Sequence, residues 1–392
     1  MKSVTLVILA GGRGSRIKNF TNLLPKPLIK FSKISLLRYI INNFSKYSID
    51  KIYILCGYKG KLIHREFHKK IINLVEINCI IEKRPMGTGG SLYSLKKIIK
   101  NDFILINGDT VFDIDFNKFI KSKNKKSIGS IALIKNKNYK SNKKLVGIGL
   151  NKKKDIIFKN NSKLMNGGIY YLNKRIFKYI KNINSSLEND IIPNLINKSL
   201  FNGMVFDNFF LDIGTPKNLK SANFLIPNYF KKPAVFLDRD GVINYDKGYT
   251  YKIKDFKFRP GVVNAIRYLN LKNYYVFIVT NQAGIAKGFY TINDFFKLQK
   301  YIKNFLIKKN IFINDIKFSP YHPKGKIKKY SIKSNFRKPG NLMIESLFVQ
   351  WNLDRKKSLM IGDKITDMKA AKKSNIKFFY VEKNLLKQVK KI

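Results

Sequence analysis

The chain has little of several residue types, and each shortage narrows what it can be. Two cysteines, Cys56 and Cys79, occur among 392 residues, which excludes a disulfide framework and fits a reducing cytoplasm. The longest apolar runs, such as VTLVILA at 4–10 and YYVFIVT at 274–280, are too short to cross a bilayer. We therefore expect a soluble, cytoplasmic protein with no membrane partner.

Acidic residues are also scarce, because 24 Asp and Glu stand against 78 Lys and Arg, for a formal net charge of +54. A basic face for nucleic acid would be one explanation. The excess is mostly lysine, however, and it runs through the whole chain. This favours a solvated basic surface that attracts anionic substrates, without a specific nucleic-acid partner.

The apolar residues are plentiful enough to build real cores. They make up 44% of the chain and aromatic residues 13%, which excludes a disordered protein. A chain of 392 residues is long enough for two domains of ordinary size.

Residues 234–244, AVFLDRDGVIN, join an apolar run to two carboxylates and a glycine. Asp238 and Asp240 stand two positions apart at the end of a predicted strand, where side chains of that spacing point the same way. Both can then face one magnesium ion and one phosphate. Such a motif normally opens a domain, so its place past the middle of the chain predicts a separate domain before it.

The first apolar run leads directly into a glycine-rich segment. VTLVILA reads as a buried parallel strand, and GGRGSR at 11–16 follows it. Glycines let backbone N–H groups approach phosphate oxygens, and arginines add positive charge. Further along, LPKPL at 24–28 holds Lys26 between two prolines, which stiffen the loop. The combination indicates a phosphate site, whereas the glycine-rich segment alone would fit a structural turn equally well.

Strand and helix patterns alternate through the first half. Strands are predicted at 51–56 and 103–108, and amphipathic helices at 35–44 and 91–100. This alternation is typical of a doubly wound parallel sheet.

Two carboxylates of the first half fall at strand ends. Asp109 follows FILING, and Asp212 ends an apolar run in FFLDIGTP at 209–216. Ligands bind at the carboxyl edge of such sheets, and two acids from separate strands can hold one magnesium ion against a triphosphate. Each alone would also suit a turn or a helix cap.

These segments together resemble the sugar-1-phosphate nucleotidyltransferases, over about residues 3–226. They are most similar to the heptose- and mannose-1-phosphate guanylyltransferases. The segments that carry the resemblance are LAGGRGSRI, PKPL, EKRPMGTGG, NGD, NGGIYYL, SLENDIIP and DIGTP.

The resemblance implies that a sugar-1-phosphate oxygen attacks the α-phosphate of a nucleoside triphosphate and that pyrophosphate leaves. Catalysis would rest on positioning and charge neutralisation. The residues expected around the triphosphate are Gly11, Gly12, Arg13, Gly14, Arg16 and Lys26, with Arg16 and Lys26 catalytic. The residues expected at the base and the sugar are Gly87, Asn166, Gly167 and Glu188. Magnesium would bind Asp109 and Asp212.

The sequence departs from this family in places. Ser15 and Ile17 replace the usual Thr and Leu, which are mild changes. Many relatives carry a Glu-Lys pair that holds the sugar phosphate, whereas this chain reads IIFKNNSK at 156–163. Lys159 and Lys163 are the candidates to replace that lysine.

Polar residues follow apolar runs in the second half as well. Thr280 and Asn281 end YYVFIVTN, Lys338 lies in FRKPG, and Asp363 and Asp367 follow LMIG. Each alone fits turn chemistry. Together with DRDG, their order along the chain predicts a phosphate site at the carboxyl ends of the strands.

This order resembles the haloacid-dehalogenase superfamily of phosphatases, over about residues 234–381. DRDGVIN, TNQAGIAKG and RKPG are most similar to the histidinol-phosphatase and heptose-1,7-bisphosphate 7-phosphatase branch. The resemblance implies that Asp238 forms an aspartyl-phosphate, and that Asp240 protonates the leaving oxygen and then activates water. Residues expected to bind the phosphoryl group and the rest of the substrate are Thr280, Asn281, Arg337 and Lys338, with Arg337 on a second phosphate. Magnesium would bind Asp238, the backbone carbonyl of Asp240, and Asp363.

Many members of this branch carry a structural zinc loop. The four matching positions here hold Ser319, Tyr321, Ser334 and Phe336, and none offers the thiolate or imidazole that zinc prefers. We expect no zinc, with His322 as an ordinary loop residue.

We predict two doubly wound, mostly parallel α/β domains: a nucleotidyltransferase fold at 1–230 and a haloacid-dehalogenase fold at 231–392. The predicted reactions are removal of the 7-phosphate from heptose-1,7-bisphosphate and transfer of a nucleotidyl group from GTP to heptose-1-phosphate. One alternative joins a mannose-1-phosphate guanylyltransferase to a histidinol-phosphate or other sugar-phosphate phosphatase. Another is a basic nucleic-acid-binding protein with inactive sites. The expected ligands are a nucleoside triphosphate, sugar phosphates and Mg²⁺, and a homo-oligomer stays open.

Overall fold

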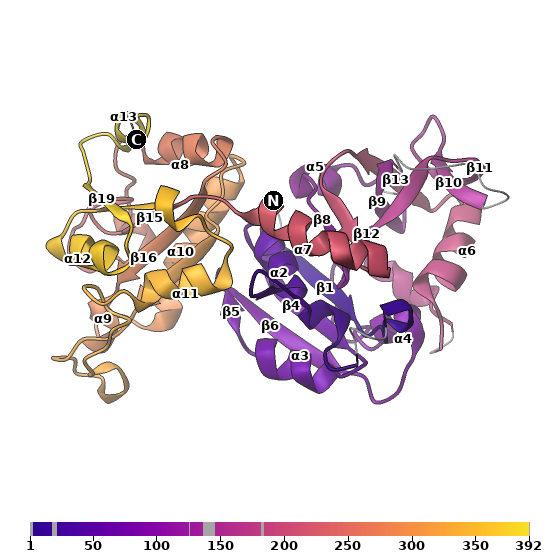
Figure 1. Cartoon of the computed structure of the whole chain (residues 1–392), viewed down its shortest axis with the longest axis horizontal. Coiled ribbons are helices and arrows are strands. Elements are labelled where there is room, and N and C mark those ends of the chain that lie inside the picture. Colours follow the sequence, from indigo (N-terminus) through magenta and orange to yellow (C-terminus); the bar gives the residue numbers. More distant parts are fainter. Residues whose placement is uncertain (1–2, 18–21, 125, 136–145, 182–183, 392) are drawn as a thin grey trace.

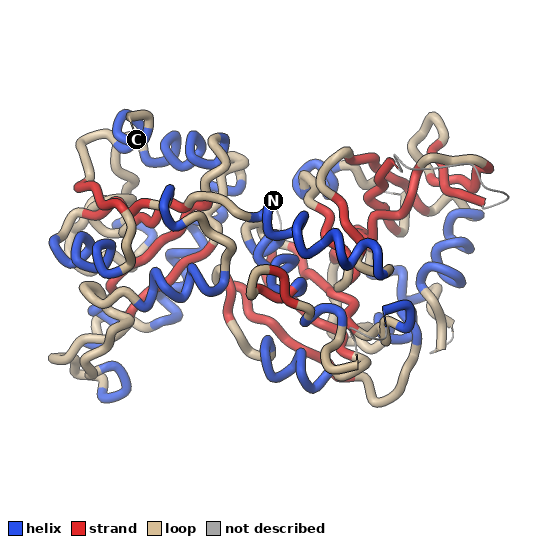
Figure 2. The backbone as a smooth tube through the Cα atoms, in the orientation of Figure 1, coloured by secondary structure: helices blue, strands red, loops and turns tan. Residues whose placement is uncertain are grey.

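The computed structural model describes residues 3–17, 22–124, 126–135, 146–181 and 184–391 (Figure 1). Within these ranges the chain folds around two main sheets, one in each half, with helices packed against both (Figure 2). No helix of the described residues combines the length and the apolar character needed to cross a bilayer.

Four parallel strands form the centre of the first sheet. In spatial order they are β6 (Val75–Ile81), β4 (Ile49–Cys56), β1 (Val4–Ala10) and β7 (Phe103–Asn107). β12 (Leu164–Leu172) then pairs antiparallel with β7. The other strands of this sheet are β5 (Ile71–Ile72), β9 (Gly129–Lys135), β10 (Val146–Leu150), β11 (Ile156–Asn160) and β13 (Phe201–Phe206).

β1 shows why the centre of this sheet is parallel. Leu6 and Ile8 are buried in the core on one face, and Val7 is buried in the core on the other. A strand covered on both faces needs a continuous apolar run, as VTLVILA provides. Helices of this half are α2 (Leu36–Ser45), α3 (Gly60–Phe67), α4 (Gly87–Tyr93), α5 (Phe116–Lys121), α6 (Ile192–Asn197) and α7 (Pro216–Phe230).

Two short ladders complete the first half. β8 (Thr110–Phe112) pairs antiparallel with β14 (Phe210–Asp212), and β2 (Lys30–Phe31) with β3 (Ile34–Ser35). The first ladder brings the segments after Asp109 and before Gly214 side by side.

The helix expected at 91–100 is wrong in its position. α4 begins earlier, at Gly87, and ends at Tyr93. The Ser91 hydroxyl donates to the carbonyl of Gly87 at 2.7 Å, and the Ser94 hydroxyl donates to the carbonyl of Ser91 at 2.7 Å. Serine hydroxyls that bond to nearby carbonyls compete with the helical ladder, and the following residues form turns instead.

The second sheet is parallel throughout. Its order is β17 (Asp315–Ser319), β16 (Tyr275–Asn281), β15 (Ala234–Leu237), β18 (Leu359–Gly362) and β19 (Lys377–Tyr380). The predicted pair of mostly parallel α/β folds is therefore confirmed. Helices of this half are α8 (Val262–Leu271), α9 (Ala283–Ala286), α10 (Ile292–Ile307), α11 (Leu342–Gln350), α12 (Ile365–Lys373) and α13 (Leu385–Val389).

Residues 231–233 connect α7 to β15. The two halves also contact each other directly. The Tyr275 hydroxyl, at the start of β16, donates to the carbonyl of Phe230 at 3.2 Å. The Asn42 side chain on α2 donates to the carbonyl of Gln350 at 2.8 Å. The rings of Tyr47 and Phe312 meet edge to face, with centroids 5.1 Å apart.

A buried lysine also bridges the halves. The Lys303 Nζ on α10 donates to the carbonyls of Ser45 at 2.7 Å and Asn73 at 2.9 Å. The backbone N–H of Asn73 donates to Asp315 Oδ1 at 2.9 Å. Burial lowers the pKa of Lys303 to about 7, against the opposing charge of Asp315. The halves are thus joined by a buried polar contact and not only by their connecting segment.

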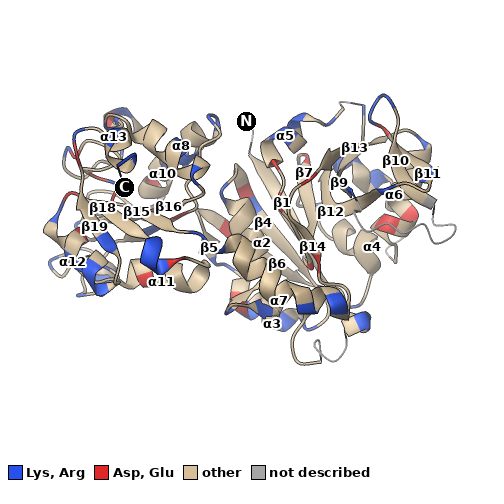
Figure 3. Cartoon of the chain, turned by 45° about the horizontal axis from the view of Figure 1, so that its top comes forward, with Lys and Arg blue, Asp and Glu red and all other residues tan. Residues whose placement is uncertain are grey.

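Basic residues are spread over both halves (Figure 3). The view shows Lys and Arg on helices and strands of each half, with acidic residues between them. The basic residues are thus not confined to one half of the chain.

Two candidate active sites

The first candidate site lies at the carboxyl edge of the second sheet. Asp238 follows β15 and is buried, with 6% of its surface exposed. The Lys338 Nζ lies 2.9 Å from Asp238 Oδ1 and 2.6 Å from Asp367 Oδ1. The fold therefore brings together an acid and a lysine that are 100 positions apart in the sequence.

Asn281 explains how Lys338 is held there. Its Nδ2 donates to the carbonyl of Lys338 at 3.0 Å, and its Oδ1 accepts from the backbone N–H of Lys338 at 3.0 Å. The Nζ of Lys338 also donates to the carbonyl of Val279 at 2.9 Å. Both ends of the Asn281 amide thus bind the lysine loop, whereas the sequence predicted contact with substrate.

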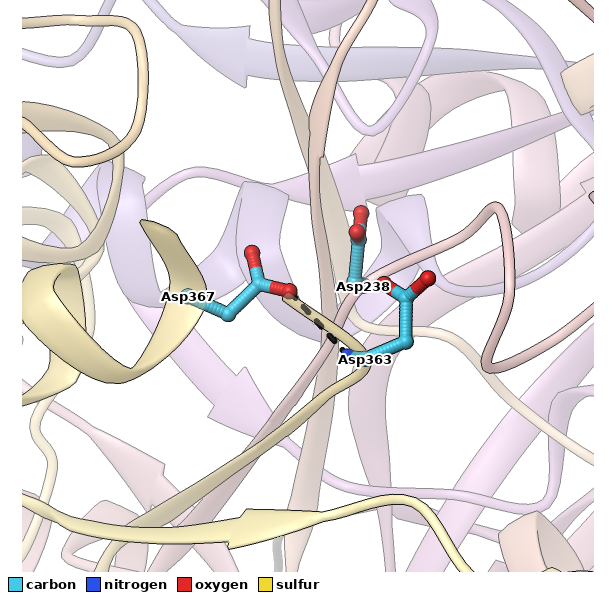
Figure 4. Close-up of side chains that lie close together, drawn as sticks. All are labelled: Asp238, Asp363 and Asp367. Carbon is cyan, nitrogen blue, oxygen red and sulfur yellow. Dashed lines mark hydrogen bonds between the residues drawn. The ribbon is translucent and has the colours of Figure 1, made fainter. Parts of the chain in front are cut away.

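Three carboxylates lie close together at this edge of the sheet (Figure 4). Asp238, Asp363 and Asp367 each offer an oxygen, and these oxygens lie within 4.8 Å of one another. Asp367 Oδ2 accepts from the backbone N–H groups of Asp363 at 3.2 Å and Lys364 at 3.1 Å. Asp367 therefore fixes the loop and pairs with Lys338, a task that its place at the start of a helix could have suggested.

One carboxylate oxygen of Asp363 is available to a ligand. Its Oδ1 is buried and has no hydrogen-bond partner among the described residues. The close approach of Gly241, whose φ is +88°, leaves no room for a side chain between the DRDG turn and Asp363. An unpaired carboxylate oxygen beside Asp238 suits a hard cation such as Mg²⁺.

The electrostatics of the cluster favour a bound cation as well. Burial raises the pKa of Asp238 above its usual range, the nearby Asp367 raises it further, and Lys338 opposes the shift. Burial also raises the pKa of Asp363. A cation beside these carboxylates would stabilise their ionised forms.

The Asp240 side chain lies outside that cluster. Its two oxygens accept from the fully buried Arg239 guanidinium, with the shortest contact 2.7 Å from Arg239 Nη2 to Oδ2. Asn244 Nδ2 donates to Oδ1 at 3.0 Å, and Gln282 Nε2 donates to Oδ2 at 2.9 Å. The side-chain oxygens of Asp240 are thus occupied by protein donors. This is compatible with the prediction that Asp240 binds magnesium through its backbone carbonyl.

Thr280 and Arg337 occupy different parts of the site. Thr280 is buried at the end of β16 and accepts from Gln282 Nε2 at 2.8 Å. Arg337 is half-buried and donates to the carbonyl of Tyr321 at 3.3 Å. Burial and the positive charges of Arg337, Lys287 and Lys324 lower the pKa of His322, so Arg337 belongs to a basic cluster beside the site.

The loop at the zinc-loop positions is held by hydrogen bonds. The backbone N–H of His322 donates to the carbonyl of Tyr330 at 3.1 Å, and His322 Nδ1 accepts from the backbone N–H of Lys324 at 3.1 Å. Ser334 Oγ accepts from the backbone N–H of Phe336 at 3.1 Å. His322 thus acts within its own loop, in line with the role expected for it.

The second candidate site is a cavity of about 520 Å³ at the carboxyl edge of the first sheet. It collects several residues expected to bind nucleotide or sugar, namely Gly11, Gly12, Arg13, Lys26, Gly87, Asp109 and Glu188. It also collects residues for which no role was predicted, among them Tyr58, Glu82, Arg84, Thr88 and Asn107. Asn107 ends β7, which was predicted, so the strand-end rule applied to Asp109 could have found it. Glu82 follows β6, for which no strand was predicted.

Lys26 and Asp109 form the charged centre of this cavity. The Lys26 Nζ lies 3.1 Å from Asp109 Oδ2, and their side chains are 9% and 33% exposed. Asp212 lies close by, because it pairs with Thr110 in the β8–β14 ladder and the backbone N–H of Ile213 donates to the carbonyl of Asp109 at 3.2 Å. Burial raises the pKa of Asp212, and the charge of Asp109 raises it further. The Asp212 Oδ1 accepts from the backbone N–H of Gly214 at 2.8 Å. Two carboxylates and one lysine thus meet where β7 and β14 end.

Glu188 reaches the cavity through Thr88. The Thr88 hydroxyl donates to Glu188 Oε2 at 2.6 Å and accepts from the backbone N–H of Leu187 at 2.7 Å. Gly87 has φ +69° and packs so closely on the carbonyl of Ser185 that a side chain would collide with it. The start of α4 is therefore fixed to the segment Leu187–Ile191.

Several expected residues are not in the cavity lining. Asn166 accepts from the backbone N–H of Gly168 at 2.9 Å and donates to the Tyr170 hydroxyl at 2.6 Å. Gly167 packs against the ring of Phe112, which leaves no room for a side chain. Gly14, Arg16, Asp212, Lys159 and Lys163 are likewise absent from the lining of the cavity. Their proposed contacts with ligand stay predictions.

Residues 5–228 match the nucleotidyl transferase family, and residues 329–381 match the haloacid dehalogenase-like hydrolases. The second half is similar to D-glycero-beta-D-manno-heptose-1,7-bisphosphate 7-phosphatase of Rhodopseudomonas palustris, at 40% identity over 152 residues, which cover 39% of this chain and 84% of that protein. It is also similar to D-glycero-alpha-D-manno-heptose-1,7-bisphosphate 7-phosphatase of Campylobacter jejuni, at 43% identity over 37% of this chain and 80% of that protein.

Among solved structures, HddC from Yersinia pseudotuberculosis is 28% identical, with a TM-score of 0.49, over 57% of this chain and 99% of that chain. The chain belongs to the nucleotidyl transferase family in its first half and to the heptose-1,7-bisphosphate 7-phosphatases in its second, and it is a bifunctional transferase and hydrolase.

Proposed function

We propose that the protein makes a nucleotide-activated heptose in two steps. The second half removes the 7-phosphate from a heptose-1,7-bisphosphate, and the first half joins the resulting heptose-1-phosphate to a nucleotidyl group from GTP. The observation that carries this proposal is the presence, in one chain, of the Asp238–Lys338 centre of a 7-phosphatase and the Lys26 cavity of a nucleotidyl transferase. The product class of the one is the substrate class of the other.

In the phosphatase step, an Asp238 oxygen attacks phosphorus and forms an O–P bond while the bond from phosphorus to the sugar oxygen breaks. Asp240 gives its proton to that sugar oxygen. Water then attacks the aspartyl-phosphate, Asp240 takes the proton of the water, and inorganic phosphate leaves with Asp238 restored. Lys338 and the Thr280 hydroxyl stabilise the charge of the phosphoryl oxygens, and Arg337 in its basic cluster binds the 1-phosphate.

The carboxylates of this centre fit a magnesium ion. Asp238, the backbone carbonyl of Asp240 and Asp363 would hold it, because Asp363 keeps a buried oxygen without a protein partner. When bound, the ion neutralises phosphoryl charge. In the first half, Asp109 and Asp212 would hold magnesium in the same way, since two neighbouring carboxylates meet one lysine there.

In the transferase step, an oxygen of the sugar 1-phosphate forms a bond to the α-phosphorus of the triphosphate, and the bond to pyrophosphate breaks. The backbone of Gly11 and Gly12 and the side chains of Arg13, Arg16 and Lys26 bind the triphosphate. Gly87 lies at the base, and Asn166, Gly167 and Glu188 lie at the sugar. No proton donor is needed, because pyrophosphate leaves as an anion whose charge these groups neutralise.

Incubation with heptose-1,7-bisphosphate, GTP and Mg²⁺ should yield phosphate, pyrophosphate and GDP-heptose, identified by mass spectrometry. Asp238→Asn should abolish phosphate release and leave transfer to added heptose-1-phosphate intact. Preference for mannose-1-phosphate or histidinol phosphate in direct competition would instead establish the alternative substrates. We place the enzyme in the cytoplasm, because its two cysteines, Cys56 and Cys79, form no disulfide framework and suit a reducing compartment.

A further inference from the structure

Gln282 lies between two groups of the phosphatase centre. It is the first residue after β16, and 2% of its surface is exposed. Its Nε2 donates to Asp240 Oδ2 at 2.9 Å and to Thr280 Oγ1 at 2.8 Å. Its Oε1 accepts from the Tyr290 hydroxyl at 2.6 Å. One buried amide therefore contacts both the proposed proton donor and the proposed phosphate-binding hydroxyl.

Chemistry fixes the orientation of this amide. The Asp240 oxygens accept from Arg239 and Asn244, and an ionised Asp240 can only accept, so the NH₂ group of Gln282 faces Asp240 before the carboxyl group takes up the proton that it transfers. The amide oxygen then faces Tyr290, whose hydroxyl has to donate. Burial raises the pKa of Tyr290, which keeps that proton in place.

Tyr290 is itself held firmly. Its ring stacks on Tyr251 with centroids 4.8 Å apart. Gly284 leaves space for the ring, since a side chain there would collide with it. The orientation of Gln282 is thus fixed from behind by packed aromatic rings.

The bond to Thr280 has a directional consequence. A hydroxyl has one proton to donate, and it can accept at the same time. Because Thr280 accepts from Gln282, its own proton is directed elsewhere. Thr280 is the last residue but one of β16, the strand beside β15, and Asp238 directly follows β15, so both lie at the same sheet edge.

We propose that Gln282 is a positioning residue of the phosphatase reaction, which holds Asp240 for proton transfer and turns the Thr280 proton toward the phosphoryl group. This proposal rests on the roles proposed above for Asp240 and Thr280. Gln282 gains and loses no proton; the proton moves from Asp240 to the sugar oxygen in the first step and from water to Asp240 in the second.

The leaving group provides the test. A sugar oxygen needs a proton to leave, whereas p-nitrophenolate leaves readily without one. Gln282→Met keeps the volume and removes the amide. We expect kcat/KM to fall about 100-fold with a sugar phosphate and about tenfold or less with p-nitrophenyl phosphate, with KM little changed, since general acid catalysis contributes about 10²- to 10⁴-fold. The sugar phosphate used is the one that the wild-type enzyme hydrolyses fastest. The result therefore does not depend on whether the natural substrate is a heptose.

Gln299 offers a matched control. It is a fully buried glutamine on α10 of the same half, and its amide has no hydrogen-bond partner among the described residues. Gln299→Met should leave the ratio of the two kcat/KM values unchanged. Tyr290→Phe frees the amide of Gln282 without removing it, and should shift the ratio in the same direction by less. If Gln282→Met lowers kcat/KM equally with both substrates, the proposal is overturned. If Gln282→Met does not fold, an unchanged ratio of the two kcat/KM values in Tyr290→Phe overturns it.

Discussion

The two candidate sites use the same pairing of a buried lysine with a carboxylate, but the carboxylates differ in exposure. Lys338 and its partner Asp238 have side chains 2% and 8% exposed, whereas Lys26 is 9% exposed and its partner Asp109, at the wall of an open cavity, is 33% exposed. A phosphoryl group is small and can be met by a closed, preorganised centre. A nucleotide and a sugar phosphate, the ligands proposed for the cavity of the second candidate site, need more open space.

The two sites also face away from each other. The halves meet near the starts of strands: Tyr275 begins β16, and Tyr47 precedes β4. β4 has eight residues, which span about 26 Å at about 3.3 Å per residue, and the cavity lies beyond its far end. α12, beside the phosphatase centre, and α4, beside the cavity, accordingly lie on opposite sides of the molecule (Figures 1 and 3).

The largest expected effect comes from the closed site. Lys338→Met removes the cation between two buried carboxylates. We expect phosphate release to fall by at least about 10³-fold and the second half to lose about 3–5 kcal/mol of stability, because breaking one partner leaves buried charge unpaired. Phosphate release and urea unfolding measure the two effects. Transferase activity is the internal control, and near-normal phosphatase activity would contradict the role of Lys338.

The open site should respond differently. Lys26→Ala removes a buried positive charge whose partner Asp109 is 33% exposed and can be solvated in its absence. Stability should therefore fall by less than in Lys338→Met, by about 1–3 kcal/mol. Pyrophosphate release should fall about 10²- to 10³-fold, because this charge stabilises the transferring phosphate. Unchanged phosphatase activity is the control. A large loss of stability would show that Lys26 is a structural residue in the way that Lys338 is.

The interface between the sites contributes a pH dependence. The pKa of Lys303 is about 7 in the folded protein against 10.5 for a free lysine, so between these values the unfolded chain binds more protons. Its contribution to stability therefore rises as pH increases from about 7 toward 10.5. Urea unfolding at pH 7 and pH 9.5 should show a difference between wild type and Lys303→Met that grows by about 1–3 kcal/mol. The same comparison with Lys308→Met, an exposed lysine just after α10, should show no such growth.

The smallest expected effect tests the opposed orientation. Asp238→Asn keeps only the transferase site and Lys26→Ala keeps only the phosphatase site. If the intermediate crosses solvent, a mixture with each variant at the wild-type concentration should make GDP-heptose at about the wild-type rate and with the same lag. A direct passage between sites would keep a raised local concentration within one chain. A mixture that is several-fold slower than wild type would contradict release of the intermediate.

Much of both sites follows from one sequence rule, that carboxylates after apolar strands gather at the carboxyl edge. Asp109, Asp212, Asp238 and Asp363 were identified in this way. The rule does not predict which polar side chains form hydrogen bonds with one another. Asn281 holds the Lys338 loop and Gln282 holds Asp240 because the chain returns to β15 from separate segments, and those distances exist only in the folded protein.

The wrong position of the helix at 91–100 has a local cause. The apolar period was real, since Leu92, Leu95 and Ile99 are buried. Serine hydroxyls nevertheless captured the carbonyls that a longer helix would need, and a hydrophobic pattern does not report that competition. The interface between the halves was also invisible, because Lys303 reads as one surface lysine among many.

The order of phosphate and pyrophosphate release tests the central claim most directly. Phosphorus NMR of the wild-type enzyme with heptose-1,7-bisphosphate, GTP and Mg²⁺ should show inorganic phosphate first, and then pyrophosphate after a lag. Asp238→Asn with the same substrates should release neither, while added heptose-1-phosphate restores pyrophosphate. Pyrophosphate formed by Asp238→Asn from the bisphosphate itself would contradict the claim that the second half prepares the substrate of the first.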